Sequence, residues 1–275
     1  MNANDHIQNS GAFQGTEREI TAMTRELDEL HNDVGMPAMW QGVERMVEGL
    51  RSGASKNAAS RRTFLMGAGA TLAGGAALIG AGLPSMAGAA TRTTKSSSAS
   101  ALAFPPANLK GDLVVAAVAA SLENLAVFAY TAGLGAATAG KLGSVPPAVA
   151  TFATTARAQH AQHAAAWNAV LRANGKAKVT VTNPTLTPVV KSDFAKVTDI
   201  TGLAKLALTL ETIAAETYQV ETSKLMSKAA IELSASIEPV EMQHIAILYY
   251  VLGMYPGAQS ASGTPLAFSA TNQAV

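Results

Sequence analysis

Hydrophobic residues recur at helical spacing in four long runs of the second half of the chain. The runs lie at about residues 112–139, 146–174, 199–222 and 224–252. Asp112 and Asp199 are suitable N-caps for the first and third runs, and Gly175 and Gly253 follow the second and fourth, where helices commonly end. The pattern therefore predicts four helices, each long enough to cross a small domain.

The lengths of the connections indicate how these helices are joined. The first and last pairs are separated by short turns, whereas residues 176–198 form a long connection. Within it, residues 178–182 alternate as a β-strand would, and Pro184 and Pro188 argue against a helix. Two hairpins joined by one long connection predict an all-α, antiparallel four-helix bundle with one crossover. Pro239 lies inside the fourth run, where we expect a kink.

The first 59 residues differ from this part in composition. Residues 1–15 are polar and expected to be disordered. Residues 16–31 and about 39–50 have short amphipathic patterns, separated by an expected break at Pro37. We interpret residues 1–59 as a cytoplasmic leader, partly helical or disordered; its two runs could alternatively pair as a hairpin or dock on a partner. His6 and His31 belong to this leader and are given no role.

An export-signal pattern begins at residue 60. Arg61-Arg62 is followed at once by Phe64-Leu65 and by a Gly/Ala-rich apolar stretch to Leu83, and Ala87-Gly88-Ala89 supplies small residues for cleavage. This order resembles a twin-arginine export signal, so we expect residues 60–89 to contact the twin-arginine export machinery and, transiently, the membrane. The alternative is a retained membrane anchor, which the many glycines disfavour.

The resemblance implies an exported protein, located in the periplasm, cell envelope or extracellular space. Its unusual feature is that 60 residues precede Arg61. Either the leader has a cytoplasmic role, or translation starts downstream, at Met36 or Met39.

Composition divides the rest of the chain into segments and excludes several classes of functional site. Residues 90–107 are Ser/Thr/Ala/Pro-rich and predict a linker, residues 108–255 hold the four-helix bundle, and residues 256–275 form an irregular tail. The chain has no Cys, which excludes disulfides and thiolate metal sites, and its net charge of +1 gives no indication of a nucleic-acid partner. Phosphate-binding loops and a G-x-S-x-G nucleophile motif are also absent from the sequence.

Candidate chemistry is concentrated in the four helical runs. Glu241 and His244 are three residues apart, so they share a face of the fourth helix, on a stripe that should be buried. His160 and His163 have the same spacing on the second helix. The first and third helices contain matching Leu-Glu segments, each with a tyrosine seven residues after the glutamate. Buried polar groups need partners, and metal coordination is one way to supply them.

Residues from about 110 to 253 resemble the ferritin-like superfamily, and within it the exported bacterial ferritin-like domain proteins related to desiccation-associated proteins. The resemblance implies a metal site built from one Glu on each of two helices and a Glu-x-x-His on each of the other two. Carried over to this sequence, the implied ligand set is Glu123, His160, His163, Glu211, Glu241 and His244. His160 stands where the family has a glutamate, so one bridging carboxylate is missing.

Two functions remain open from the sequence. The first is an exported bundle that binds iron, as one ion or a pair, or another divalent metal, with a role in iron handling or oxidative stress. The second is a non-catalytic, structural or stress-associated protein that keeps the fold without a metal. In that case the Glu and His side chains would form a hydrogen-bonded network in the core. Whether the chain is an enzyme stays open.

Overall fold

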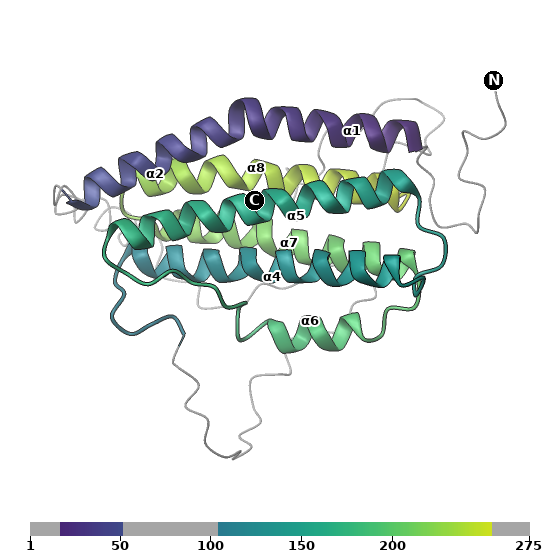
Figure 1. The fold of residues 1–275 in the computed structure, drawn as a ribbon. Helices are drawn as coiled ribbons and strands as arrows, with labels where there is room; N and C mark the ends of the chain where they lie inside the picture. The colour runs from purple at the N-terminus through teal and green to yellow at the C-terminus, as the bar shows by residue number, and fades with distance from the viewer. Residues whose placement is uncertain (1–16, 52–103, 255–275) are drawn as a thin grey trace, which may run out of the picture.

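The computed structural model describes residues 17–51 and 104–254 (Figure 1). Four long helices form an antiparallel bundle: α4 (Asp112–Thr138), α5 (Pro147–Ala173), α7 (Ile200–Lys224) and α8 (Lys228–Val251). The described residues contain no strand, so the predicted all-α bundle is confirmed. The signal segment 60–89, most of the linker and the tail after residue 255 lie outside the described residues.

The crossover between α5 and α7 differs from the sequence expectation. Its β-like part is irregular and is held by Asn168, which donates to the carbonyl of Val179 and accepts from its N–H at 3.0 and 2.7 Å. The crossover also contains a short helix, α6 (Thr187–Phe194), with Pro188 in its first turn. The argument that prolines exclude a helix here was wrong, because the first turn needs no intrahelical N–H donor.

The helix ends explain two features of the bundle. Asp199 caps α7 as predicted, since its carboxylate accepts from the N–H of Gly202 at 2.7 Å. Asp112 does not cap its own helix; it accepts from the N–H groups of Met226 and Ser227, at 2.8 and 3.0 Å. It therefore ties the start of α4 to the turn between α7 and α8. Helix α8 continues through Pro239.

The first described segment is a long helical rod beside the bundle. It consists of α1 (Glu17–Leu30), the π-helical turn η1 (His31–Gly35) and α2 (Met36–Arg51). The expected break at Pro37 is wrong, because the helix continues through it. The wider turn ends at Gly35, two residues before this proline, which lacks the N–H that a regular helix would require.

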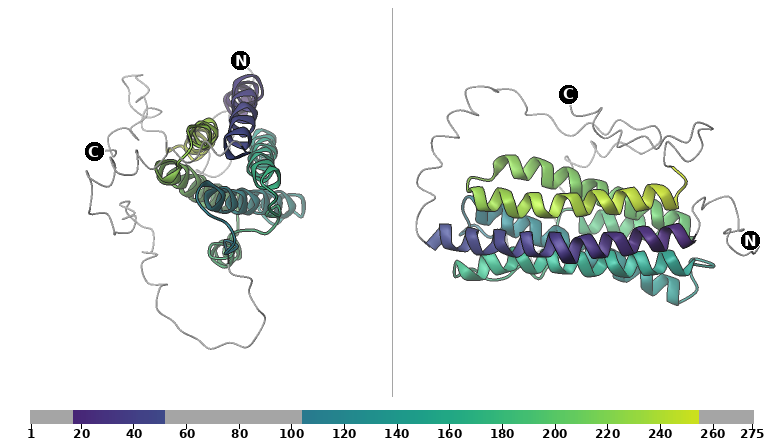
Figure 2. Two further views of the ribbon diagram at one scale, coloured as in Figure 1. Left: turned by 90° about the vertical axis from the view of Figure 1, so that its left-hand side faces the viewer. Right: turned by 90° about the horizontal axis from the view of Figure 1, so that it is seen from above.

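The rod lies along α5 and α8 and completes the bundle on that side (Figure 2). Its buried face contains Ile20, Leu27, Met39, Val43 and Met46. These residues belong to the two apolar clusters that also contain core residues of the four-helix bundle. The described part of the leader is thus a structural part of the same core.

Among the described residues, α4 alone is long and apolar enough to cross a membrane, with a mean hydropathy of 1.8. Helix α4 packs along α5, and Glu123 near its middle is buried. Such a composition is also that of a core helix in a bundle, which is the position that α4 occupies here.

Candidate metal centre

The six residues implied as ligands meet inside the bundle. Each of the four long helices contributes: α4 and α7 one glutamate each, α5 two histidines, and α8 a glutamate and a histidine. All are buried, with exposed fractions of 2% or less. The three-residue spacings place each pair on one inward face of its helix, as expected from helical geometry. The set is Glu123, His160, His163, Glu211, Glu241 and His244.

The ligand atoms form two overlapping groups. Glu123 and His163 complete the first, Glu211 and His244 complete the second, and both include His160 and Glu241. Within each group the ligand atoms lie within 4.8 Å of one another. Two neighbouring metal positions that share a side chain from α5 and one from α8 are the arrangement of a dinuclear site. The shared residue on α5 is an imidazole.

His160 lies between the two terminal glutamates. Its Nδ1 is 2.8 Å from Glu123 Oε2, and its Nε2 is 3.1 Å from Glu211 Oε1. When both nitrogens donate to carboxylates, the ring carries a positive charge. The His160 imidazolium thus supplies between the two carboxylates part of the positive charge that a metal ion would supply.

Two tyrosines support the glutamates in a crossed arrangement. The hydroxyl of Tyr130 on α4 donates to Glu211 on α7, and the hydroxyl of Tyr218 on α7 donates to Glu123 on α4. Trp167 in turn donates to the Tyr218 hydroxyl at 2.9 Å. The equal spacing in the two Glu-to-Tyr segments therefore has a structural reason, because each helix orients the carboxylate of the other.

His163 and Glu241 are the groups that this network leaves unsatisfied. Both ring nitrogens of His163 and both carboxylate oxygens of Glu241 are buried and make no hydrogen bond. His163 Nδ1 lies 3.0 Å from Glu241 Oε1, so the two are in ion-pair contact without hydrogen-bond geometry. Buried polar atoms without partners are costly, and nitrogen and carboxylate donors of this kind fit a divalent metal.

Gln159 defines the orientation of His244. Its side-chain oxygen lies 2.8 Å from His244 Nε2, which therefore donates, and Nδ1 is left facing Glu211 Oε2 at 3.3 Å. A histidine held by a hydrogen bond at one nitrogen presents the other to a metal. The amide nitrogen of Gln159 reaches Asp28 of α1 at 3.4 Å, which links the N-terminal rod to the centre.

His31 of η1 is a second link between the rod and the centre. Its Nε2 is 2.7 Å from the side-chain oxygen of Gln162, and its ring meets that of His163 edge-to-face, with centroids 5.3 Å apart. His31 is 2% exposed, so this residue of the leader, which was given no role from the sequence, is part of the surroundings of the centre. The rod covers the centre on the side of α5.

Charge and burial act against each other at the centre. For His160, burial alone would lower the pKa, but Glu241 and Glu211 raise it well above the ordinary value. The pKa of His163 rises in the same way to about 9, chiefly because of Glu123. The pKa of Glu123 falls to about 2, because His163 and His160 outweigh its burial.

His31 shows the opposite balance. Burial, followed by the charge of His163, lowers the pKa of His31 to about 4, although the hydrogen bond with Gln162 partly opposes this shift. We therefore expect a neutral His31 beside a positively charged His163 when the centre holds no metal.

The sequence pattern identified the six central residues but missed their supports. Gln159 precedes His160 on the same helix, and a single glutamine gives no signal of its own. His31 lies 129 residues before His160, so no spacing rule connects the two. Only the packing of the rod brings them together.

Comparison with known proteins agrees with this architecture. No match to the chain was found among the curated proteins or the solved structures that were compared. A protein-family model described as ferritin-like domain matches residues 111–254, which covers α4 to α8 and all six central residues. The chain therefore belongs to the ferritin-like domain family.

Proposed function

We propose that this protein is an exported ferritin-like protein that binds one divalent metal ion, iron being the first candidate, and acts in iron handling or oxidative stress outside the cytoplasm. The observation that supports metal binding most directly is that His163 and Glu241, although in ion-pair contact with each other, make no hydrogen bond in the buried centre. Six buried side chains with only carboxylate and imidazole donors are a suitable ligand set for iron, zinc or another divalent ion.

From the sequence we expect the metal to be centred on Glu211, Glu241 and His244, with help from Glu123 or His163. In the structure these three residues share a group with His160, whereas Glu123 and His163 complete the neighbouring group. An iron ion bound there would supply redox chemistry, and the protein would supply a dry site with fixed ligands. Tyr130 and Gln159 would hold Glu211 and His244 in place. Since His160 replaces a bridging carboxylate, we expect a second position of this centre to hold metal weakly or not at all.

A specific observation favours the alternative function as well. His160 already joins Glu123 and Glu211 through both ring nitrogens, and each of these carboxylates has a tyrosine partner. Such a network stabilises the core without a metal. The protein would then be a non-catalytic, structural or stress-associated member of its family.

Metal stoichiometry separates the two functions. The full chain is stripped with a chelator, loaded anaerobically with ferrous iron, desalted and measured by elemental analysis. We expect at most one iron per chain in the wild type and two in His160→Glu, because the added carboxylate restores the shared ligand. His160→Gln is the matched control: it removes the ring without adding charge, so it should not gain a second iron.

The other outcomes are equally informative. Two irons per wild-type chain would show that His160 does not disable the second position. Absence of metal from both the wild type and His160→Glu, in protein that retains its helical content, would support the structural function.

Export forms a separate part of the proposal. It is supported by the sequence pattern from Arg61-Arg62 to Ala87-Gly88-Ala89. The twin-arginine route carries folded proteins, which would allow a bundle of this kind to bind its metal before export. Desiccation or another stress outside the cytoplasm would be the setting of its action.

A further inference from the structure

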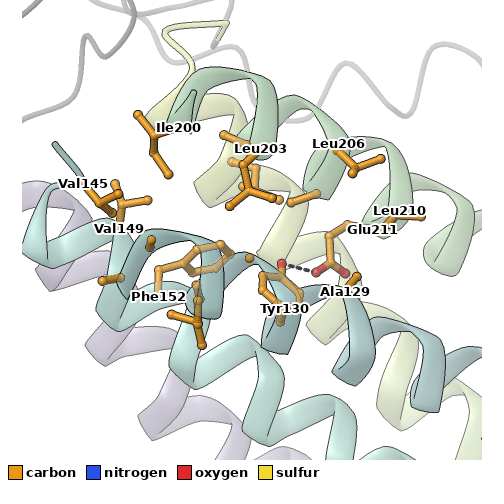
Figure 3. Close-up of a pocket in the computed structure, with 18 of the residues that line it drawn as sticks. Ala129, Tyr130, Val145, Val149, Phe152, Ile200, Leu203, Leu206, Leu210 and Glu211 are labelled. Carbon is orange, nitrogen blue, oxygen red and sulfur yellow. Dashed lines mark hydrogen bonds between the residues drawn. The ribbon is translucent and has the colours of Figure 1, made fainter. Parts of the chain in front are cut away.

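An apolar cavity of about 70 Å³ lies between α4, α5 and α7, next to the metal centre (Figure 3). Its lining is apolar except for two side chains, Tyr130 and Glu211. These two are hydrogen-bonded to each other and lie together at one end of the cavity, as the dashed line in Figure 3 shows. The cavity is partly open to the surface.

Small residues on three helices leave this space. On α4 a helical stripe of alanine and glycine lines the cavity, and α5 and α7 contribute further alanines. Larger apolar side chains complete the lining, among them Phe152 and Leu203. Protein cores are normally filled to crystal-like density, so the space that these alanines and the glycine leave among larger apolar side chains is available to a guest molecule.

The polar end of the cavity adjoins the candidate metal centre. The ring of Tyr130 stacks on that of His160, with centroids 5.7 Å apart and 28° between the planes. Glu211, the partner of Tyr130, is one of the six central residues. A molecule in the cavity would therefore be separated from the candidate metal position only by the side chains of Tyr130 and Glu211.

We propose that this cavity binds the alkyl end of a free, short-chain aliphatic molecule, with its terminal carbons directed toward Tyr130 and Glu211. An apolar guest is indicated because the two polar side chains already satisfy each other and the remaining walls offer only hydrocarbon. The polar group of the guest would remain at the open side, in water.

The size of the cavity limits the guest. A 150 Å³ apolar cavity accommodates benzene, so 70 Å³ should enclose roughly three carbon atoms, and longer chains would extend toward the surface. The proposal deepens the proposed function, because it names the kind of molecule placed beside the centre. Binding of the guest requires only the folded helices that form the cavity and no metal ion, so it can be tested on metal-free protein.

The test measures binding of methanol, ethanol, 1-propanol, 1-butanol and 1-hexanol to the metal-stripped full chain, by saturation-transfer NMR with titration. We expect saturable binding that tightens by about four-fold per methylene while the chain fills the cavity, and by less beyond that. 1,4-Butanediol is the matched polar ligand and should not bind. Because no metal is present, failure here is distinct from failure of the iron experiment.

Two alanines of α5 provide matched variants. Ala153 lines the cavity and Ala158 is exposed, so Ala153→Leu fills the space whereas Ala158→Leu adds the same side chain to the surface. We expect Ala153→Leu to weaken binding of 1-butanol at least ten-fold, and Ala158→Leu to leave it unchanged. If Ala153→Leu fails to fold, Gly133→Ala replaces it, since a Cβ there would lie 2.9 Å from Leu203 Cδ2 and push that side chain.

Four results would overturn the proposal. The first is the absence of saturable alcohol binding to the wild type, and the second is equal alcohol binding by the cavity-filling variant and the wild type. The third is alcohol binding only after residues 255–275 have been removed. The fourth is binding of the protein to phosphatidylcholine vesicles while it does not bind free alcohols. The third would identify the chain's own tail as the occupant, and the fourth would identify a membrane lipid.

Discussion

At the scale of single residues, His160 controls the chemistry that this bundle can perform. A glutamate at this position would add a negative charge between the two metal positions, whereas His160 adds a group that attracts a proton. Its surroundings reinforce this difference, because the neighbouring Glu241 and Glu211 raise the pKa of His160. Metal ions and protons therefore compete for the same carboxylates.

This competition predicts how the stability of the metal-free protein depends on pH. The pKa of His163 is raised from 6.5 to about 9, so its contribution is complete below about pH 6.5 and is lost as the pH rises through 9. The difference corresponds to roughly 3 kcal/mol at most. The pKa of Glu123 is lowered to about 2, so its contribution is complete above about pH 4.5 and is lost as the pH falls toward 2.

His31 adds to the loss at acid pH. Its pKa falls to about 4, so its contribution is present above about pH 6.5 and is lost as the pH falls through 4. Urea unfolding of the chelator-treated protein should thus give a maximum near pH 6–7 and a lower free energy of unfolding at pH 9. His163→Gln should flatten the alkaline side. A free energy that does not change between pH 6.5 and 9 would contradict the charge balance inferred here.

At the scale of helices, the contact between α2 and α8 leaves little room for a larger side chain. A Cβ at Gly42 would lie 3.0 Å from both Cα and Cβ of Leu233, so the two backbones approach closely. A Cβ at Gly49 would have no neighbouring atom within 4 Å. Both glycines lie within α2 and should gain up to about 1 kcal/mol of helix propensity on change to alanine.

The two alanine variants therefore form a matched pair. Gly49→Ala should raise the free energy of unfolding slightly, whereas Gly42→Ala should lower it by about 1–2 kcal/mol, because overpacking outweighs the gain in propensity. Urea unfolding of the full chain, followed by circular dichroism, measures both. If the two variants behaved alike, α2 would not be packed against α8 in solution.

The helices also show what the sequence could and could not predict. Periodicity and loop lengths were enough for α4, α5, α7 and α8, because each buries a continuous apolar face. Helix α6 was missed because a proline in a first turn was taken as a breaker. The π-turn before Pro37 was missed because a proline can be accommodated by local widening, which no pattern of apolar residues reveals.

For the whole molecule, the prediction was limited by contacts between distant segments. Spacing within each helix was sufficient to assemble Glu241 with His244 and His160 with His163. The position of α1 and α2 could not be predicted, because the composition of their apolar faces is equally compatible with packing on a partner protein and on the chain's own bundle. Only the complementary shapes of the packed surfaces decide between the two. The rod contributes His31 and Asp28 to the surroundings of the centre, so the candidate site extends beyond the family-matched residues.

This arrangement has a consequence for the proposed export and processing. The signal pattern lies in sequence between α2 and α4, so cleavage near Ala89 would divide the chain into a piece with the rod and a piece with the four-helix bundle. The rod buries five large apolar side chains, and Arg45 forms an ion pair with Glu232 of α8 at 2.9 Å. We therefore expect the rod to remain bound to the bundle after cleavage, which would place residues 17–51 outside the cytoplasm and not in a cytoplasmic leader.

Cell fractionation of a C-terminally tagged full chain tests export and retention together. Replacing Arg61 and Arg62 with lysine should leave the protein in the cytoplasm, because lysine keeps the charge but not the guanidinium groups of the signal. Arg92→Lys is the matched control and should be exported.

N-terminal sequencing of the exported, natively purified wild type should find a chain beginning near Ala90, and mass spectrometry should find peptides of residues 17–51 bound to it. An exported protein that lacks the rod would contradict retention, since His31 and the apolar face of α1 and α2 would then be dispensable for the folded centre. An uncleaved exported chain that still contains residues 64–83 would instead indicate a membrane anchor.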